Sequence, residues 1–232
     1  MKFLYVLLFT VFATSGFAED LMPSAQEILN RMASSFAKIE DYVVTLEGTI
    51  KMEGVNVPKT EAILFYKKPD KIHIESKGIL FLPKKVIVIN PYYLKTYFKP
   101  LSIEKKIVKE VTIYKIKLIP KEKRLGNDIE IWVEDKHWSI KKMKITRFKG
   151  STVIAHIEYT MIKGKYWLPK STLVEIKIPT KARRPEIFQD FGEIDPWEEK
   201  GTGKPKTGIV NISFKNYRGV NAGLSDEVFK TK

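Results

Sequence analysis

The chain has 232 residues, 44% of them hydrophobic, a formal net charge of +14 at pH 7, and no cysteine. The apolar content is enough for a substantial core, and the lack of cysteine excludes disulfide bonds and thiol catalysis. The charge favours anionic partners such as an anionic membrane surface, although lysines at the outward positions of strands would account for it equally well.

Residues 1–18 have the pattern of a secretory signal peptide. Lys2 precedes an apolar run over residues 3–12, and small residues surround a cleavage point after Ala18. The run is shorter than the roughly 20 apolar residues of a membrane-spanning helix. We therefore expect export to the periplasm, cleavage near Ala18 and a mature chain 19–232 that forms one domain. No cysteine is present at the cleavage point to carry a lipid anchor, so we expect a released, soluble protein.

One amphipathic helix is predicted at the start of the mature chain. Ser24 and Glu27 have the spacing of a capping box. Apolar residues then recur every four positions at Ile28, Met32 and Phe36. The pattern predicts a helix of about four turns that ends near residues 38–41.

From Tyr42 onward the apolar period becomes two, which is typical of half-buried strands. The clearest case is residues 129–160, where three alternating runs joined by short turns predict an antiparallel meander. A turn is expected over residues 53–59, and Asn90-Pro91 is interpreted as a hairpin turn. The predicted strands, about eleven of them, are 42–52, 61–67, 71–76, 86–89, 92–98, 105–118, 128–133, 138–148, 152–161, 167–178 and 209–217.

The strand count predicts a cavity. About eleven strands make a sheet on the order of 50 Å wide, whereas one helix covers a strip about 10 Å wide. We therefore expect a mainly β fold, a curved antiparallel half-barrel with the N-terminal helix in its concave side. Space that the helix leaves becomes an apolar cavity, unless Phe, Ile and Leu side chains pack it solid. The residues predicted to line the cavity are Leu46, Phe65, Ile74, Val88, Phe98, Ile131, Ile145, Ile157 and Phe214.

Residues 179–207 interrupt the strand pattern with a basic run, an acidic run and a Gly- and Lys-rich link. An insertion of this length indicates either a disordered surface loop or a functional lid. Its apolar residues argue against pure disorder. They are Ile187, Phe188, Phe191, Ile194 and Trp197.

Patterns typical of catalysis are scarce. His73, His137 and His156 are scattered and have no metal-binding spacing. No nucleophile elbow and no phosphate-binding glycine loop occurs. The sequence therefore predicts no catalytic residues, no metal and no cofactor, and the export signal argues against nucleic acid as a partner.

Several segments together resemble the LolA-like outer-membrane lipoprotein carriers and lipoprotein-sorting proteins. They are the helix A-Q-E-I-L-N-R-M-A-S-S-F-A-K-I, the strands I-E-I-W-V-E and I-K-K-M-K-I-T-R-F-K-G, the segment Y-W-L-P-K, and the closing V-N-A-G-L-S-D-E-V-F. The resemblance covers essentially the whole mature chain. It departs from the family pattern because no arginine lies between Arg31 and Arg124, where the lipoprotein-carrying members use one on an early strand. It also departs in the size of the 179–207 insertion.

The resemblance implies a half-barrel whose apolar cavity takes the acyl chains of lipoproteins or lipids. It implies a monomeric periplasmic carrier and not an enzyme. Such a carrier would receive cargo from an inner-membrane transporter and deliver it to an outer-membrane receptor. The alternative is a periplasmic sensor or regulatory module on the same fold, which would bind a membrane signalling protein.

Overall fold

The computed structural model describes residues 22–52, 55–76, 90–122, 127–147, 151–178 and 206–230. Within these ranges, the helices and strands in chain order are α1 (Ala25–Phe36), β1 (Asp41–Met52), β2 (Val55–Lys67), β3 (Lys71–Ser76), α3 (Pro91–Tyr97), β4 (Phe98–Val108), β5 (Val111–Pro120), β6 (Asn127–Glu134), β7 (Ser139–Arg147), β8 (Thr152–Ile162), β9 (Tyr166–Ile178), β10 (Lys206–Arg218) and the 3-10 helix η3 (Asp226–Phe229). No helix in the described part of the chain is both long enough and apolar enough to span a bilayer.

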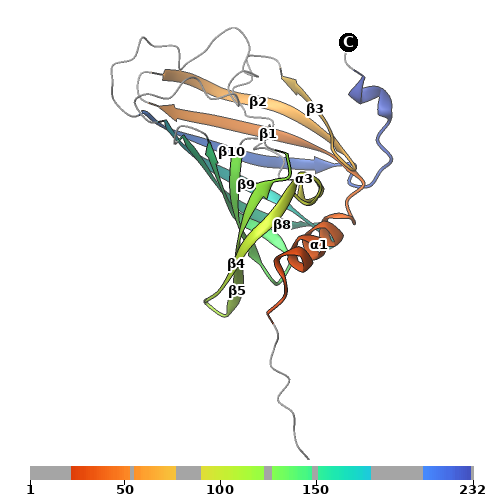
Figure 1. The fold of residues 1–232 in the computed structure, drawn as a ribbon. Coiled ribbons are helices and arrows are strands. Elements are labelled where there is room, and N and C mark those ends of the chain that lie inside the picture. Colours follow the sequence, from red (N-terminus) through yellow and green to blue (C-terminus); the bar gives the residue numbers. More distant parts are fainter. Residues whose placement is uncertain are drawn as a thin grey trace, which may run out of the picture.

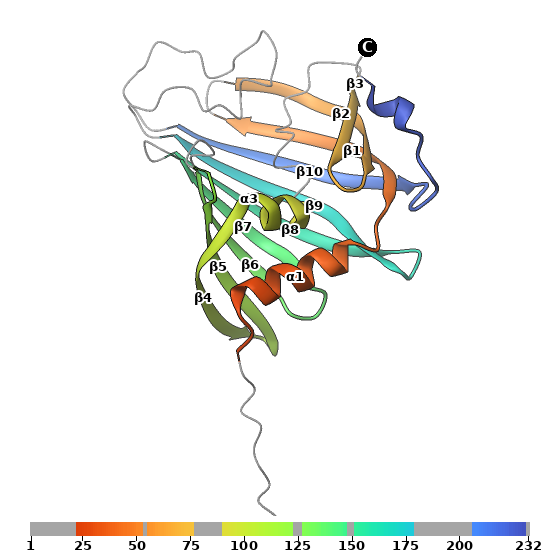
Figure 2. The ribbon, with the colours of Figure 1, turned by 45° about the vertical axis from the view of Figure 1, so that its right-hand side comes forward.

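The strands of the described ranges form one antiparallel sheet of ten strands in the order β3-β2-β1-β10-β9-β8-β7-β6-β5-β4. Strands β4 to β10 follow one another as a meander, and β10 then pairs with β1, for example at Leu46 and Phe214. The sheet ends in two separate edges, β3 and β4, so it is not closed into a barrel. Figures 1 and 2 show its curvature, with both helices on the same side of the sheet. The predicted half-barrel is confirmed.

Helix α1 begins where the capping box predicts, but it ends before the predicted end near residues 38–41. The Ser24 side chain accepts a hydrogen bond from the Glu27 backbone N–H at 3.1 Å, which satisfies one of the free donors of the first turn. The Glu27 carboxylate pairs with Arg31 one turn later. The helix ends at Phe36, and its buried residues are Ala25, Ile28, Leu29, Met32 and Ala33.

Two predicted elements between residues 90 and 120 are wrong. The segment 92–98 is not a strand, because Asn90 is the N-cap of α3: its side chain accepts from the Tyr92 N–H at 2.9 Å. Pro91 occupies the first helical turn, where its missing N–H has no cost. The run 105–118 is not one strand, since β4 and β5 turn at Lys109 and Glu110, both with positive φ.

Strand β2 also begins earlier than the turn predicted over residues 53–59 allows. It starts at Val55 and pairs with β1 from its first residue. The predicted strand 86–89 lies outside the described residues, as does the predicted signal peptide.

The buried side chains on the helix-bearing side of the sheet form two clusters. The helix cluster combines α1 and α3 with β4 to β8: Ala25, Ile28, Leu29, Met32, Leu94, Phe98, Tyr114, Ile116, Leu118, Ile129, Ile131, Val133, Ile140, Met143 and Ile157. The strand cluster contains no buried residue from a described helix. Its buried members are Ile39, Tyr42, Val44, Leu46, Ala62, Leu64, Tyr66, Val153, Ala155, Leu168, Val174, Ile176, Val210, Ile212, Phe214 and Val220.

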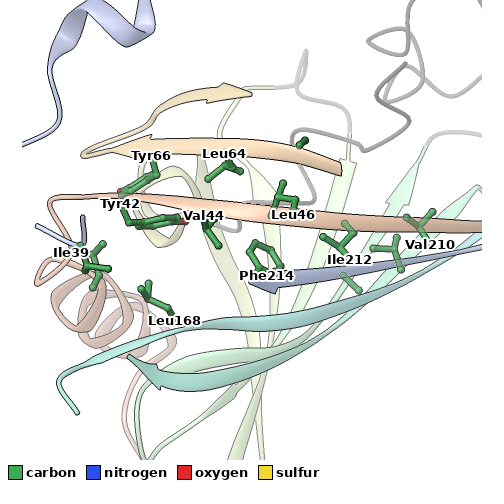
Figure 3. Close-up of a cluster of buried hydrophobic side chains, with 14 of the residues drawn as sticks. Ile39, Tyr42, Val44, Leu46, Leu64, Tyr66, Leu168, Val210, Ile212 and Phe214 are labelled. Carbon is green, nitrogen blue, oxygen red and sulfur yellow. The ribbon is translucent and has the colours of Figure 1, made fainter. Parts of the chain in front are cut away.

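The strand cluster follows the period-two alternation of β1 and its neighbours. Tyr42, Val44 and Leu46 are buried, and the residues between them are only partly buried. Their side chains meet those of β2 and β10 on one face of the sheet (Figure 3). The rings of Tyr42 and Tyr66 stack with their centroids 5.0 Å apart.

Candidate functional site

A pocket of about 580 Å³ opens where the two clusters meet. It lies beside the second half of α1, between the helix, the β6–β7 turn and the adjoining ends of β8 and β9. Its apolar lining takes Met32, Ile140 and Ile157 from the helix cluster and Ile39 and Tyr42 from the strand cluster. Its volume falls within the roughly 300–1,000 Å³ of small-molecule sites.

The end of α1 determines where this pocket begins. The spacing of Met32 and Phe36 places both on the face of the helix that lines the pocket. The Phe36 ring meets Tyr66 of the strand cluster edge-on at 5.5 Å. The helix ends at Phe36, so the sheet beyond that point has no α1 backbone above it.

Aromatic rings from the β6–β7 turn and from β8 and β9 form one wall of the pocket. The ring of Trp167 stacks with that of His137, with centroids 4.0 Å apart, and with that of Tyr159, with centroids 6.1 Å apart. Trp138 stacks on Tyr114 at 6.1 Å. The guanidinium of Arg31 lies 4.7 Å from the centre of the Trp138 ring, within cation–π range.

The polar groups of this wall bond to one another. The Glu134 carboxylate accepts from the Ser139 hydroxyl at 2.8 Å and lies 3.1 Å from Nδ1 of His137. The Trp167 indole N–H donates to Ser139 Oγ at 3.3 Å. A nucleophilic serine would need to donate its hydroxyl hydrogen bond to the histidine, whereas the Ser139 hydroxyl donates to the Glu134 carboxylate. The arrangement therefore orients the rings and does not assemble a catalytic triad.

The Tyr159 hydroxyl donates to the Ile140 carbonyl at 3.1 Å. Burial raises the pKa of this phenol, and the nearby Glu134 charge raises it further. The hydroxyl therefore remains protonated at neutral pH and acts as a hydrogen-bond donor, not as a base.

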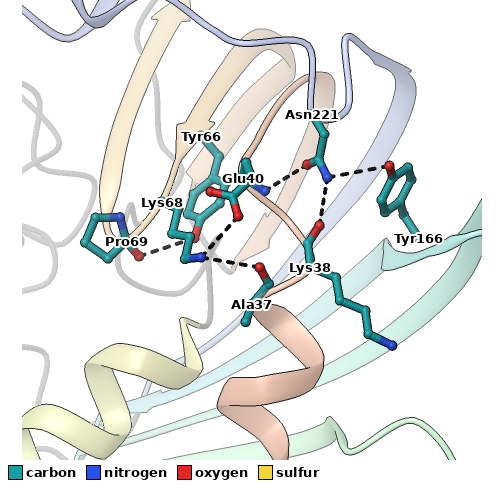
Figure 4. Close-up of polar contacts among 8 residues, drawn as sticks. All are labelled: Ala37, Lys38, Glu40, Tyr66, Lys68, Pro69, Tyr166 and Asn221. Carbon is teal, nitrogen blue, oxygen red and sulfur yellow. Dashed lines mark hydrogen bonds and ion pairs between the residues drawn. The ribbon is translucent and has the colours of Figure 1, made fainter.

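Asn221 fixes the backbone at the mouth of the pocket. Its side chain accepts from the Glu40 N–H at 2.8 Å, and it donates to the Lys38 carbonyl at 2.7 Å and to the Tyr166 hydroxyl at 3.5 Å (Figure 4). Lys38 and Tyr166 both line the pocket. One asparagine thus ties the end of α1, strand β9 and the C-terminal segment together.

The charged residues that line the pocket are all basic: Arg31, Lys38, Lys136 and Lys165. No described Asp or Glu belongs to the lining. Nor does the described part of the chain place three or more His, Asp or Glu side chains where they could share a metal ion. The pocket therefore combines an apolar interior with a basic rim.

Most of the residues predicted to line a cavity lie on the core face, but they are spread along it. Phe98, Ile131 and Ile157 belong to the helix cluster, and Leu46 and Phe214 belong to the strand cluster. Ile74 and Ile145 pack against these clusters. Of the described residues in the set, Ile157 alone lines the pocket.

Phe65 lies on the other face of the sheet. It pairs with Val43, whereas the buried Leu64 and Tyr66 pair with Val44 and Tyr42. Directly paired residues share a face, so a shift of one residue reverses the side. The Phe65 ring instead lies near His73, at 5.8 Å.

Val88 and the predicted lid residues Ile187, Phe188, Phe191, Ile194 and Trp197 lie outside the described residues. The sequence interpretation missed the pocket residues Met32, Phe36, Trp138, Tyr159 and Trp167. The four-residue period of α1 contained the signal for the first two. The three strand and turn residues become neighbours only through the pairing of β6 to β9.

The fold has known structural relatives. A LolA superfamily protein from Nitrosomonas europaea superposes with a TM-score of 0.56 at 10% identity, covering 90% of this chain and 99% of that one. A DUF1329 family protein from Desulfovibrio piger gives 0.55 at 13% identity, with 88% and 95% covered. A domain named for outer membrane lipoprotein sorting, from Vibrio parahaemolyticus, gives 0.51 at 14% identity, with 89% and 97% covered.

These likenesses confirm the LolA-like resemblance at the level of the fold. At the level of sequence, no family model matches the chain, and no curated protein does either.

Proposed function

Because the chain has the LolA-like fold, we propose that it is a periplasmic carrier that binds the acyl chains of lipoproteins or lipids and delivers them toward the outer membrane. The observation that carries this proposal is the pocket at the junction of the two clusters. Its apolar walls hold an alkyl chain away from water, and each buried CH₂ contributes about 0.8 kcal/mol. Such a site binds and releases its cargo without chemical change, so no catalytic residue is required.

The proposed cycle needs partners at both ends. An inner-membrane transporter would load the carrier, and an outer-membrane receptor would unload it. Unloading requires either a receptor that binds the chain more tightly or a second conformation with a weaker pocket.

The first test is native mass spectrometry of the exported protein after mild extraction, followed by titration of the delipidated protein with a fluorescent long-chain fatty acid. We expect co-purified lipid and saturable uptake of the fatty acid. Protein that carries no lipid and takes none up contradicts the proposal. A pull-down that then recovers a membrane signalling protein would favour the regulatory module instead.

The second test fills the pocket. Met161 lines it and is 44% exposed, so Met161→Trp adds bulk at the mouth with little strain on the core. Leu173→Trp is the matched control, because Leu173 is 37% exposed on β9 and does not line the pocket. We expect Met161→Trp to weaken fatty-acid binding at least about tenfold, a loss of about 1.4 kcal/mol, while Leu173→Trp binds like the wild type. Equal binding by the two variants would place the acyl site elsewhere.

A further inference from the structure

The basic residues at the pocket come from three separate parts of the chain. Arg31 belongs to α1 and Lys38 follows it, Lys136 lies in the β6–β7 turn, and Lys165 lies in the β8–β9 turn. The fold therefore brings cations that are remote in sequence to one pocket, beside an apolar interior.

The lysines at the pocket differ from the ion-paired lysines of the sheet. Lys59 and Lys215 form ion pairs with Glu47. The hydrogen bond from Lys215 and, second, the one from Lys59 lower the pKa of the Glu47 carboxyl. Lys115 and Lys144 pair in the same way with Glu130. Many of the lysines thus have an acidic partner on a neighbouring strand.

Lys38, Lys136 and Lys165 make no ion pair within the described residues. The backbone of Lys38 is held by Asn221, and its side chain extends away from that contact (Figure 4). The Lys165 ammonium lies 5.3 Å from the centre of the Tyr166 ring. Arg31 is already engaged with Glu27 and Trp138.

Two acids near the pocket are engaged elsewhere. Glu134 bonds to Ser139 and His137, and Glu40 pairs with Lys68 at 3.1 Å. Three ammonium groups at an apolar pocket thus have no carboxylate partner among the described residues, unlike the lysines that pair with Glu47 and Glu130. Ammonium groups are effective point charges for a phosphate, which accepts several charged hydrogen bonds at once.

We infer that the pocket takes an anionic amphiphile, with its tail among the apolar residues and a phosphate-bearing head group at Lys38, Lys136 and Lys165. This inference rests on the proposed function and narrows it. A neutral diacylglyceryl group would use the pocket but leave the three cations without a partner. The cargo class that fits the whole site is a phosphate-bearing lipid.

The test compares three probes on the delipidated protein: a short-chain phosphatidylglycerol, a diacylglycerol with the same chains, and inorganic phosphate. The variant Lys38→Gln/Lys136→Gln/Lys165→Gln removes the three cations. The matched control Lys99→Gln/Lys105→Gln/Lys106→Gln removes the same charge from exposed positions on β4. Thermal unfolding of both variants verifies that they fold.

We expect the wild type and the control to bind phosphatidylglycerol at least about tenfold more tightly than diacylglycerol, a preference that shrinks as salt is added. The pocket variant should lose this preference and keep its affinity for diacylglycerol. Inorganic phosphate should bind far more weakly than the phosphatidylglycerol.

Equal binding of the two lipids by the wild type overturns the head-group inference and leaves the carrier proposal intact. A control variant that loses the preference as fully as the pocket variant also overturns it, since net charge would then be the cause. If inorganic phosphate binds as tightly as the lipid, the inference that the ligand is an amphiphile is wrong. Failure of both lipids to bind removes the proposed function itself.

Discussion

The helix cluster and the strand cluster lie on one sheet, yet they are completed by different parts of the chain. In the helix cluster, side chains of α1 and α3 pack against β4 to β8. In the strand cluster, the sheet's own residues pack with Ile39 and with Val220 of the C-terminal segment. The pocket lies where one arrangement gives way to the other. The comparison shows that the end of a single helix can determine where a curved sheet has a pocket.

The largest expected effect comes from truncating one buried side chain in each cluster. Met32 and Leu64 are both almost fully buried, and Met32 also lines the pocket. We expect Met32→Ala and Leu64→Ala each to lower the free energy of unfolding by about 2–5 kcal/mol, as measured by urea denaturation. Only Met32→Ala should change the affinity for the fatty-acid probe. If Leu64→Ala changes it as much, the two clusters do not act separately.

The next effect concerns the segment that completes the strand cluster. The Asp41 carboxylate is buried and accepts the backbone N–H groups of Ala222, Gly223 and Leu224, each at 3.0 Å. Asp41→Ala leaves the Gly223 and Leu224 donors without this acceptor, whereas the Ala222 N–H keeps the Gly219 carbonyl at 3.1 Å. We expect a loss of about 1.5–3 kcal/mol in unfolding free energy. Hydrogen exchange should be faster at the amides of Gly223 and Leu224.

The control for this change is Asp128→Ala, which removes an exposed carboxylate whose ion pair, to Lys117, is on the surface. Exposed pairs contribute about 0–1 kcal/mol, so this variant should unfold close to the wild type. Protection of the amides of Gly223 and Leu224 that survives in Asp41→Ala would mean that other contacts hold the segment.

A smaller, pH-dependent effect should report on the strand cluster. Burial raises the pKa of Tyr42 and of Tyr66 in the folded protein. In the unfolded chain both titrate near pH 10. The contribution of these two tyrosines to the free energy of unfolding is complete below about pH 10. It is lost above that pH, because the unfolded state then binds fewer protons than the folded state. We expect stability to fall by about 1.4 kcal/mol per pH unit for each such tyrosine.

Urea denaturation measured at intervals between about pH 9 and about pH 11 gives this slope. Tyr42→Phe removes one titrating group and should make the slope smaller. An unchanged slope in Tyr42→Phe would show that Tyr42 does not cause the loss of stability at high pH.

The elements that could be predicted from the sequence are those that local periodicity determines. The spacing of Ile28, Met32 and Phe36 predicts α1, and the alternation from Ile129 to Val133 predicts β6 and its buried face. The interpretation of Asn90-Pro91 as a hairpin turn was wrong, since the same pair also suits a helix start. The helix forms because Asn90 caps it.

The position of the pocket could not be predicted in this way. It depends on how far α1 extends over the sheet and on the strand register that brings Trp138, Tyr159 and Trp167 together. Period two gives the two faces of a strand but not which face is inward, and Phe65 shows the consequence. The basic rim could not be predicted from the sequence either, because its lysines lie in turns that are far apart in the sequence.

The pairing of β1 with β10 imposes an order on biogenesis. The partners of β1 on that side, such as Phe214 opposite Leu46, leave the ribosome long after β1 itself. Until they arrive, one side of β1 presents unpaired backbone groups, the kind of edge on which chains aggregate. Contacts so distant in sequence form slowly. Newly made chains should therefore depend on molecular chaperones during the interval before the last strand docks.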